Sequence, residues 1–480
     1  MYLGIDVGTS GVKAVLLGDD GIVVAQATAP LAVSRPQPGW SEQDPDAWLG
    51  AVDAAVLALD PALRRQVAAI GLAGQMHGAT VLGADECPLR PAILWNDGRS
   101  FAECATLEAE VPELREIAAN KAMPGFTAPK LAWLRKHEPA LFAQIRTVLL
   151  PKDYVRLWLT GDQATDLSDA AGTLWLDVGA RAWSDALLAA TGLAREHMPR
   201  LHEGSEVTGT LREAIAARWG MARVPVAAGG GDNAAGAAGV GVVGDGDALL
   251  SLGTSGTIFV ATDALRANPD RAVHAFCHCL PGLWHQMSVH LSAASCIDWA
   301  ARLTGVDGPA ALFALAESAG PASGPELFLP YLSGERTPHD DAQVRGAFLG
   351  LDHETTPARL AAAVLEGVAF ALADGADALR EAGTVLSELA VIGGGARSRH
   401  WGAIIAAAMN VRLVYLEGGE VGPALGAAKL ARIALTGEAP GAVCTRPPGT
   451  HTIEPDPLLA ERLAPKLAKF RRAYPALRTL

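Results

Sequence analysis

The tetrapeptide Gly-Thr-Ser-Gly occurs twice in this chain, at 8–11 and at 253–256. Each copy lies between two short apolar runs, a pattern typical of two strands joined by a tight turn. The copies stand at the starts of two near-equal halves, which favours duplication of a structural unit over a chance match. The sequence therefore predicts two related α/β halves, each opening with a β-hairpin.

The length of the chain leads to the same expectation. At 480 residues it exceeds what a single hydrophobic core usually accommodates. We expect two domains, residues 1–243 and 244–480, with a cleft between them. Asp44 followed by Pro45 predicts the start of a helix in the first half. The order of predicted elements there, three strands, this helix and a further strand, differs from a Rossmann unit, because the glycine-rich turn here joins two strands.

The two copies differ at one informative position. When they are aligned on the tetrapeptide, Asp6 of the first copy corresponds to Ser251 of the second. Only one wall of the expected cleft therefore supplies a carboxylate there. Asp6 is a hard oxygen ligand beside a glycine turn, which suits Mg²⁺ held directly or through water. A buried structural aspartate is the alternative interpretation.

Charge limits the classes of ligand. Lys and Arg number 39 against 52 Asp and Glu, a formal net charge of -13, which opposes nonspecific binding to nucleic acid or anionic lipid. A phosphorylated ligand must then be held locally, by backbone N–H groups, hydroxyls and a few cations. The two turns offer such groups at Thr9, Ser10, Gly253 and Thr254. Lys13 either reaches a phosphate as a point charge or is an exposed strand lysine.

The candidate catalytic base is Asp232. It follows the apolar run 224–228 and three glycines, Gly229–Gly231, at the carboxyl end of a predicted strand, where open α/β sheets place their ligands. Glycines allow backbone and substrate to approach closely. An aspartate that caps a helix beginning at Asn233 is the alternative, but a cap does not require three preceding glycines. We therefore favour general-base catalysis.

A second polar segment follows the predicted strand 67–73. Gln75, Met76 and His77 place an amide, a thioether and an imidazole at the same sheet edge, and sugars require convergent hydrogen bonds of this kind. A single histidine is as often structural as functional, so both interpretations of His77 stay open. Trp40 either forms a wall of a sugar pocket or marks the entry to the helix that follows.

The six cysteines are scattered and predict no disulfide framework. Cys277-His278-Cys279 lacks the spacing of structural zinc sites, so we expect buried strand thiols rather than a metal. The amino terminus lacks a basic region and reaches an acidic residue early, which argues against a signal peptide, and no apolar run approaches a membrane span. These features predict a cytoplasmic protein without a membrane partner.

Taken together, these motifs resemble the FGGY carbohydrate kinases over nearly the whole chain. The segments that carry the resemblance are 4–10, 151–170 and 393–398. Within that family, segments 73–78, 95–99, 229–233 and 331–339 are similar to the xylulose kinases. As a set these matches are very specific.

The resemblance implies an α/β fold of two actin-like, ribonuclease-H-like ATPase domains flanking a catalytic cleft. It implies transfer of the γ-phosphate of ATP to D-xylulose, giving D-xylulose 5-phosphate in xylose catabolism, with the sugar held by the first domain and ATP mainly by the second. A homodimer is also a family expectation. A kinase for another pentulose is one alternative. An actin-like or chaperone-like ATP switch is another, and it would consume ATP without an added polyol.

The resemblance also assigns roles to individual residues. Asp232 would take the proton from the 5-hydroxyl of the sugar, which Met76, His77 and Asn233 would contact. Asp6 would act through Mg²⁺. The residues expected around the phosphates are Thr9, Ser10, Lys13, Gly253 and Thr254, and those expected beside the adenosine are Gly394, Gly395 and Ala396.

Overall fold

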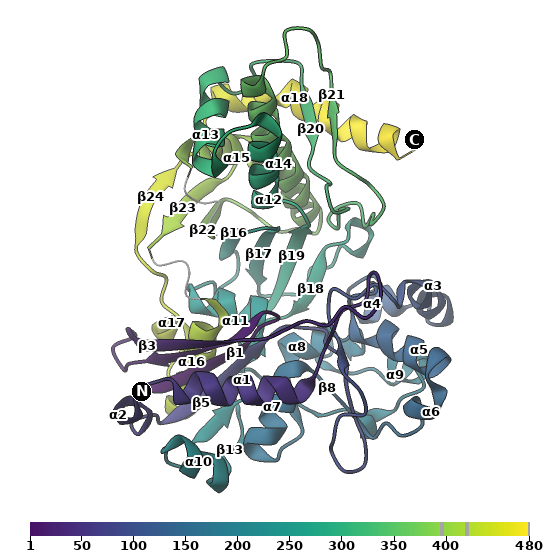
Figure 1. Ribbon diagram of the computed structural model, residues 1–480, viewed down its shortest axis with the longest axis vertical. Helices are drawn as coiled ribbons and strands as arrows, with labels where there is room; N and C mark the ends of the chain where they lie inside the picture. Colours follow the sequence, from purple (N-terminus) through teal and green to yellow (C-terminus); the bar gives the residue numbers. More distant parts are fainter. Residues whose placement is uncertain (394–397, 418–421, 479–480) are drawn as a thin grey trace.

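The computed structural model describes residues 1–393, 398–417 and 422–478 and has two lobes, each built around a mixed β-sheet (Figure 1). The first lobe contains most of the amino-terminal half, and the second contains most of the rest. None of the helices in these described ranges is long and apolar enough to cross a bilayer. The predicted α/β class and two-lobed architecture are confirmed.

The sheet of the first lobe has the order β13-β14-β5-β1-β2-β3, with β15 paired to β5. Strands β1 and β2 form an antiparallel hairpin. Strand β1 also pairs in parallel with β5, and β5 pairs in parallel with β14. The strands of this sheet are β1 (Tyr2–Val7), β2 (Gly11–Leu17), β3 (Val23–Pro30), β5 (Ala69–Gly74), β13 (Val207–Thr210), β14 (Pro225–Ala227) and β15 (Gly230–Gly231).

The sheet of the second lobe has the order β18-β19-β17-β16-β22-β23-β24. Here too an antiparallel hairpin, β16–β17, is followed by parallel pairing of β16 with β22 and of β22 with β23. The strands are β16 (Ala248–Leu252), β17 (Gly256–Thr262), β18 (His274–Cys277), β19 (Trp284–His290), β22 (Glu388–Ile392), β23 (Arg412–Leu416) and β24 (Gly449–Ile453). The two sheets share a central arrangement, an antiparallel hairpin whose first strand pairs in parallel with a later strand, and differ at their edges; the shared part agrees with the duplication predicted from the repeated tetrapeptide.

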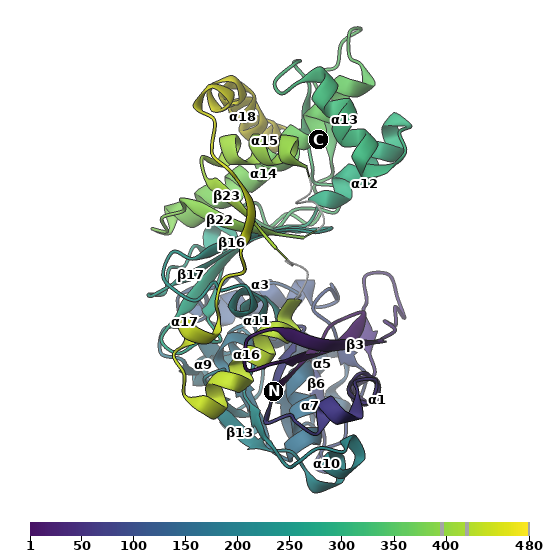
Figure 2. The same cartoon turned by 90° about the vertical axis from the view of Figure 1, so that its left-hand side faces the viewer.

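The helices cover the sheets in two groups. Those of the first lobe are α1 (Pro45–Leu57), α3 (Phe101–Glu110), α5 (Thr127–His137), α7 (Pro151–Thr160), α8 (Leu167–Ala171), α10 (Glu213–Trp219) and α11 (Asp232–Gly239). Those of the second lobe are α12 (Ala294–Thr304), α13 (Gly308–Ala319), α14 (Pro357–Glu381), α15 (Arg399–Met409) and α18 (Pro457–Leu477). The second group lies on the side of its sheet that points away from the first lobe (Figures 1 and 2).

The helix predicted after Asp44 begins as the sequence indicates. The side chain of Asp44 accepts a hydrogen bond from the backbone N–H of Asp46, and Pro45 occupies the first turn, where no N–H partner is needed. Trp48 on this helix is fully buried in a core that also contains Leu3 and Ile5 of β1. One face of the first sheet is thereby covered.

The opposite face of the first sheet is covered by a helix from the far end of the chain. Helix α16 (Gly422–Thr436) packs on β1 and β5 and beside α11, as Figures 1 and 2 both show. A Cβ at Gly4 would lie 1.9 Å from the carbonyl oxygen of Ala424, and one at Gly71 would lie 1.9 Å from that of Ala427. The helix backbone therefore rests directly on the sheet. The boundary at 243/244 stays a prediction.

We expect Gly71→Ala to destabilise the protein, because its methyl group would overlap the backbone of α16. Overpacking of this kind typically lowers the free energy of unfolding by about 1–3 kcal/mol. Scanning calorimetry should show a lower unfolding temperature. Gly50→Ala is the matched control, since a Cβ there meets open space on α1 and alanine favours the helix. An unchanged unfolding temperature for Gly71→Ala would contradict direct packing.

Candidate active site

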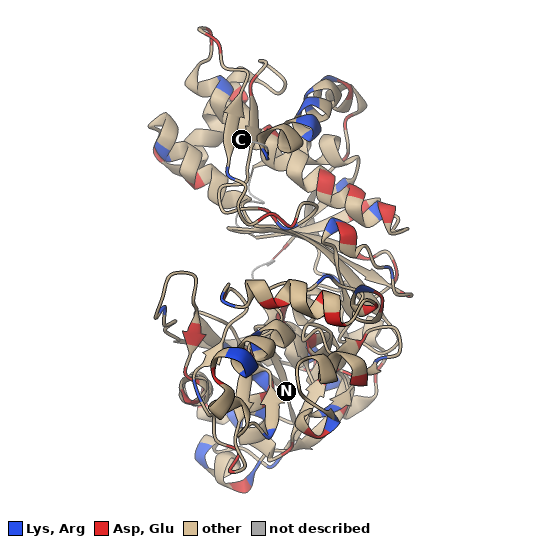
Figure 3. Ribbon diagram, turned by 90° about the vertical axis from the view of Figure 1, so that its right-hand side faces the viewer, with Lys and Arg blue, Asp and Glu red and all other residues tan. Residues whose placement is uncertain are grey.

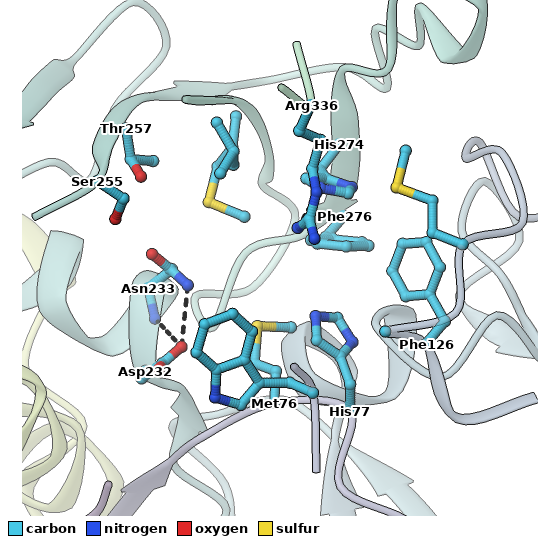
Figure 4. A pocket seen from close by; sticks show the side chains of 15 residues that line it. Met76, His77, Phe126, Asp232, Asn233, Ser255, Thr257, His274, Phe276 and Arg336 are labelled. Atoms are coloured by element: carbon cyan, nitrogen blue, oxygen red, sulfur yellow. Dashed lines mark hydrogen bonds between the residues drawn. The ribbon is translucent and has the colours of Figure 1, made fainter. Parts of the chain in front are cut away.

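A cavity of about 250 Å³ lies between the two lobes (Figure 4). The first lobe lines it with Met76, His77, Trp95, Phe126, Asp232 and Asn233. The second lobe lines it with Ser255, Thr257, His274, Phe276, Met287 and Arg336. The structure thus brings the predicted base and all three predicted sugar contacts to one cavity, although they come from distant parts of the chain.

The three glycines before Asp232 have a steric reason. Gly229 has φ +82°, and a Cβ there would lie 1.8 Å from the carbonyl oxygen of Leu72 on β5. Gly230 and Gly231 then pair with the end of β5 as β15. The chain crosses the sheet edge at backbone contact distance, and Asp232 follows as the first residue of α11.

Asp232 does not cap its helix, because Gly231 occupies that position and no side chain caps α11. Its Oδ1 instead accepts hydrogen bonds from the backbone N–H of Asn233 at 2.8 Å and from the Asn233 side-chain amide at 2.9 Å. Burial raises the pKa of Asp232 to about 6, and the two bonds from Asn233 oppose that rise. A carboxylate with this pKa is suited to proton transfer near neutral pH.

Asp6 lies close enough to Asp232 for the two carboxylates to repel each other. Burial raises the pKa of Asp6 to about 7, repulsion by Asp232 adds to that rise, and the charge of Lys13 opposes it. Lys13 is the direct cross-strand partner of Asp6 in the β1–β2 ladder. Oδ1 of Asp6 is buried and has no hydrogen-bond partner among the described residues. These properties fit a carboxylate whose charge awaits a cation or its coordinated water.

We expect Asn233→Ala to move the acidic limb of the kcat/KM–pH profile to higher pH. The amide of Asn233 stabilises the ionised form of Asp232, so its removal raises the pKa of Asp232 further above about 6. The base must be ionised to act, and below its pKa the active fraction falls about tenfold per pH unit. A limb that moved to lower pH in this variant would contradict the assigned hydrogen bond.

His77 has a fixed tautomer. Its Nδ1 lies 2.5 Å from the carbonyl oxygen of Gly172, which only accepts, so Nδ1 carries the proton and Nε2 is left as an acceptor. Burial lowers the pKa of His77 to about 3, so the ring is neutral. His77 also has φ +67°, and its carbonyl oxygen accepts hydrogen bonds from Thr127 and Lys130. The imidazole is thus presented to the cavity by a constrained backbone.

The sequence analysis did not identify Lys130 as a residue of the site. It is fully buried on α5, and its Nζ donates to the carbonyl oxygens of His77 and Gly125, both at 2.8 Å. Both acceptors belong to the cavity wall. A lysine among apolar residues in the stretch 126–134 was the available signal, but its partners lie outside its own helix.

Thr9 connects the first glycine turn with the cavity. Its hydroxyl donates to Oε1 of Gln75 at 2.9 Å and accepts from Nε1 of Trp95 at 3.0 Å. The amide of Gln43 donates to the backbone carbonyl of Thr9 at 2.7 Å. The turn is therefore tied to the segment at 75–77, part of which lines the cavity, while Ser10 beside it is exposed.

The second glycine turn lies across the cleft. The pair that closes it is Leu252–Gly256, whereas Val7–Val12 closes the first turn, so the second loop is one residue shorter despite the identical tetrapeptide. The carbonyl groups of Gly253 and Thr254 accept hydrogen bonds from the start of α12, at Ala294 and Ala293, respectively. Thr254 itself is exposed, and the neighbouring Ser255 lines the cavity. The predicted phosphate roles of both turns stay predictions.

Of the predicted adenosine residues, Gly394, Gly395 and Ala396 lie outside the described residues. The preceding Gly393 is described and has φ +97°. A Cβ there would lie 2.7 Å from the carbonyl oxygen of Leu252, so the loop after β22 starts beside the second glycine turn. This is the counterpart of the approach of Gly229 to Leu72 in the first lobe.

Two further motifs lie outside the cavity lining. Trp40 packs edge-on against Trp133, with ring centroids 5.4 Å apart, and the guanidinium of Arg99 lies 3.6 Å from its ring. Cys277 and Cys279 are buried, as is His278 between them. Within the described ranges, no group of three or more side chains is arranged to hold a metal ion.

A buried ion cluster supports the segment that precedes Asp232. Lys152 is fully buried, and its Nζ lies 2.6 Å from Asp153, 2.8 Å from Asp166 and 3.2 Å from Asp169. Ser168 donates to Asp166 and accepts at 3.1 Å from the backbone N–H of Gly231. The segment before Asp232 is thereby fixed to a charged cluster that excludes water.

Comparison with known proteins assigns the family. Sequence models of the FGGY family of carbohydrate kinases match residues 1–239 for the N-terminal domain and 248–435 for the C-terminal domain. The chain belongs to the FGGY family of carbohydrate kinases. The two matched domains correspond to the two lobes, each of which contains one of the glycine turns.

Individual relatives agree with that assignment. The chain is 57% identical to the xylulose kinase of Escherichia coli K12, over 91% of each protein. It is 52% identical to the xylulose kinase of Klebsiella pneumoniae, over the full length of both. Among solved structures, the xylulose kinase of Rhodospirillum rubrum matches with a TM-score of 0.93 at 29% identity, covering 100% of this chain and 99% of that one.

Proposed function

We propose that this FGGY kinase transfers the γ-phosphoryl group of ATP to D-xylulose, giving ADP and D-xylulose 5-phosphate. The observation that carries the proposal is the cavity between the lobes, which combines an aspartate of raised pKa with Met76, His77 and Asn233. Two full-length relatives named as xylulose kinases support the choice of sugar.

Asp232 acts as the general base on the 5-hydroxyl of the sugar. Phosphoryl transfer requires the attacking oxygen to be positioned and to lose its proton, and a carboxylate of pKa about 6 can accept that proton near neutral pH. Neutral His77 and the amide of Asn233 orient the sugar by hydrogen bonds. The apolar wall at Met76 excludes water from the site of transfer.

ATP would lie against the second lobe, with its phosphates between the two glycine turns. Thr9, Ser10, Lys13, Gly253 and Thr254 offer donors there, and Gly394, Gly395 and Ala396 would adjoin the adenosine. On the face of the protein in Figure 3, basic residues are scattered among acidic ones, which fits local rather than global attraction of phosphate.

Asp6 is the residue that would hold Mg²⁺, directly or through water. Its Oδ1 is buried without a partner in the described part of the chain, and its pKa is raised to about 7, so the uncompensated carboxylate suits a hard cation. When bound, Mg²⁺ would offset charge on the β- and γ-phosphates. Lys13, opposite Asp6 in the ladder, adds a further positive charge.

The test is a coupled ADP-release assay with ATP and Mg²⁺, comparing D-xylulose with D-ribulose, L-ribulose, L-xylulose, glycerol and gluconate. We expect D-xylulose to give the highest kcat/KM. Preference for another acceptor would keep the kinase and change its substrate. ADP release independent of every acceptor would favour an ATP switch instead.

The oligomeric state and the compartment rest on family resemblance and sequence character. We expect a cytoplasmic homodimer. Light scattering coupled to size exclusion at micromolar concentration measures the mass of the particle directly. A mass equal to the 49.6 kDa of one chain would rule out the dimer under those conditions.

A further inference from the structure

A single cation faces the sugar cavity from the second lobe. Arg336 lines the cavity, and its Nη1 lies 3.4 Å from Nε2 of His274. Figure 4 shows the guanidinium entering the cavity above His77, beside His274 and Phe276. No other side-chain or carbonyl acceptor binds this guanidinium among the described residues, so most of its five N–H donors remain available to a ligand.

The nearest carboxylates are already engaged. Asp340 forms an ion pair with Lys121 at 2.5 Å. Glu335 accepts backbone hydrogen bonds from Leu291 and from Arg336 itself and lies 3.5 Å from His290. Within the described ranges, no carboxylate lies within 4 Å of the Arg336 guanidinium. Burial lowers the pKa of Arg336 and the nearby charges of Asp340 and Glu335 oppose that shift, but neither carboxylate accepts a hydrogen bond from the guanidinium, so a ligand can supply the missing acceptors.

The orientation of Arg336 is set from both lobes. His274 stacks on Phe276 with an interplanar angle of 13°. Its Nδ1 faces Oδ1 of Asn120 at 3.4 Å, and Asn120 is anchored by donating to Ala275 and Ala118 at 2.8 Å. If Nδ1 donates to Asn120, Nε2 is free to accept from Arg336. The contacts from Asn120 through His274 to Arg336 thus orient the guanidinium toward the cavity.

The two ends of the cavity differ in their chemistry. Figure 4 shows Asp232 and Asn233 at one end, and Arg336 with His77 and Phe126 toward the other. A pentulose whose 5-hydroxyl reacts at Asp232 must place its opposite end, with the carbonyl at carbon 2, toward Arg336. A carbonyl oxygen only accepts hydrogen bonds and a guanidinium only donates them, so the two are complementary.

We infer that Arg336 binds the carbonyl end of the sugar and makes the enzyme prefer a ketose to the corresponding alditol. The inference rests on the proposed function. In the alditol, the carbonyl becomes a hydroxyl whose proton needs an acceptor. Arg336 offers none, and Phe276 and Phe126 beside it are apolar. Nε2 of His77, the acceptor at that end, is already assigned to another hydroxyl of the sugar in the proposed binding mode. An unpaired polar hydrogen in a desolvated site weakens binding.

The test compares wild type with Arg336→Met on D-xylulose and on its two reduction products, xylitol and D-arabinitol. We expect KM for D-xylulose to rise about 10- to 100-fold, as for loss of hydrogen bonds to a charged group, with KM for ATP changed less than about twofold. The ratio of kcat/KM for the ketose to that for the alditols should fall by a similar factor. Arg336→Lys keeps the positive charge and loses the paired N–H donors of the guanidinium. Its KM for D-xylulose should lie between those of the wild type and Arg336→Met.

Arg345→Met is the matched control, because Arg345 lies in the same segment, is exposed, and bonds only to nearby carbonyl oxygens of Ala342 and Val344 in the described structure. It should leave all constants unchanged. If Arg336→Met does not fold, Arg336→Lys and His274→Phe carry the same comparison.

Two results would overturn the inference: an unchanged KM for D-xylulose, or equal losses for ketose and alditol, which would indicate a merely structural role. Failure of the proposed function would be visible in the wild type alone, as no turnover of D-xylulose. If the wild type prefers another ketose, that ketose and its alditols replace D-xylulose, xylitol and D-arabinitol in the comparison. A preferred acceptor without a carbonyl would refute the role of Arg336.

Discussion

Asp232→Ala is expected to lower kcat by at least about 10²-fold, the usual contribution of a general base. The carboxylate is the acidic group that lines the cavity within the described chain, and its pKa of about 6 suits proton abstraction near neutral pH. Steady-state ADP release measures the loss. Calorimetric titration with ATP should show nearly unchanged affinity, because the assigned ATP contacts lie elsewhere.

Two further variants sharpen that experiment. Asp232→Asn keeps the size of the side chain and removes its basicity, so it should lose about as much activity as Asp232→Ala. Asp263→Ala, at an exposed aspartate beyond β17, should retain full turnover. Near-normal kcat in either Asp232 variant would remove the base assignment. Equal loss of ATP binding would point to misfolding instead.

The sequence predicted those parts of the fold and site that depend on local pattern. The repeated tetrapeptide predicted two hairpins, and Asp44 with Pro45 predicted the start of α1. Asp232 was found because three glycines are needed where the chain meets Leu72 on β5 at backbone contact distance. In each case the physical cause lies within a few residues of the signal.

The features of the fold that the sequence analysis did not predict depend on contacts between distant segments. The sequence around Gly4 and Gly71 does not indicate that these glycines pack against α16, which lies more than 350 residues later. Lys152 appears as an ordinary charged helix residue until Asp166 and Asp169 fold against it. The one-residue difference between the two glycine turns is also invisible, because the flanking ladders decide where each turn closes.

The wall that the second lobe contributes to the cavity was missed for the same reason. Met76, His77 and Asn233 follow or adjoin strand ends of the first sheet, where sequence analysis searches for ligands. His274 begins an antiparallel strand, and Arg336 lies in the irregular segment between β20 (Leu327–Leu329) and β21 (Ala347–Leu349). Their approach to the first lobe depends on how the two lobes pack, so a pocket assembled between them is only half visible in the sequence.

Asp6→Ala should damage Mg²⁺-dependent turnover. The buried, unpartnered Oδ1 of Asp6 is the described oxygen best suited to the cation, directly or through water. We expect the Mg²⁺ concentration for half-maximal rate to rise about 10-fold or more and kcat at saturating Mg²⁺ to fall about 10- to 100-fold, as when a ligand or outer-shell partner of a metal is lost. The rate as a function of free Mg²⁺ at fixed ATP measures both.

A readout independent of turnover separates this role from general damage to the site. Mn²⁺ in place of Mg²⁺ allows binding of the cation–nucleotide complex to be followed by electron paramagnetic resonance, and Asp6→Ala should weaken it. Asp19→Ala is the control, because Asp19 is 80% exposed at the far end of β2. An unchanged Mg²⁺ response would leave Asp6 as a buried structural carboxylate. In that case its raised pKa of about 7 means that it is about half protonated at neutral pH, because burial and Asp232 both oppose its charge.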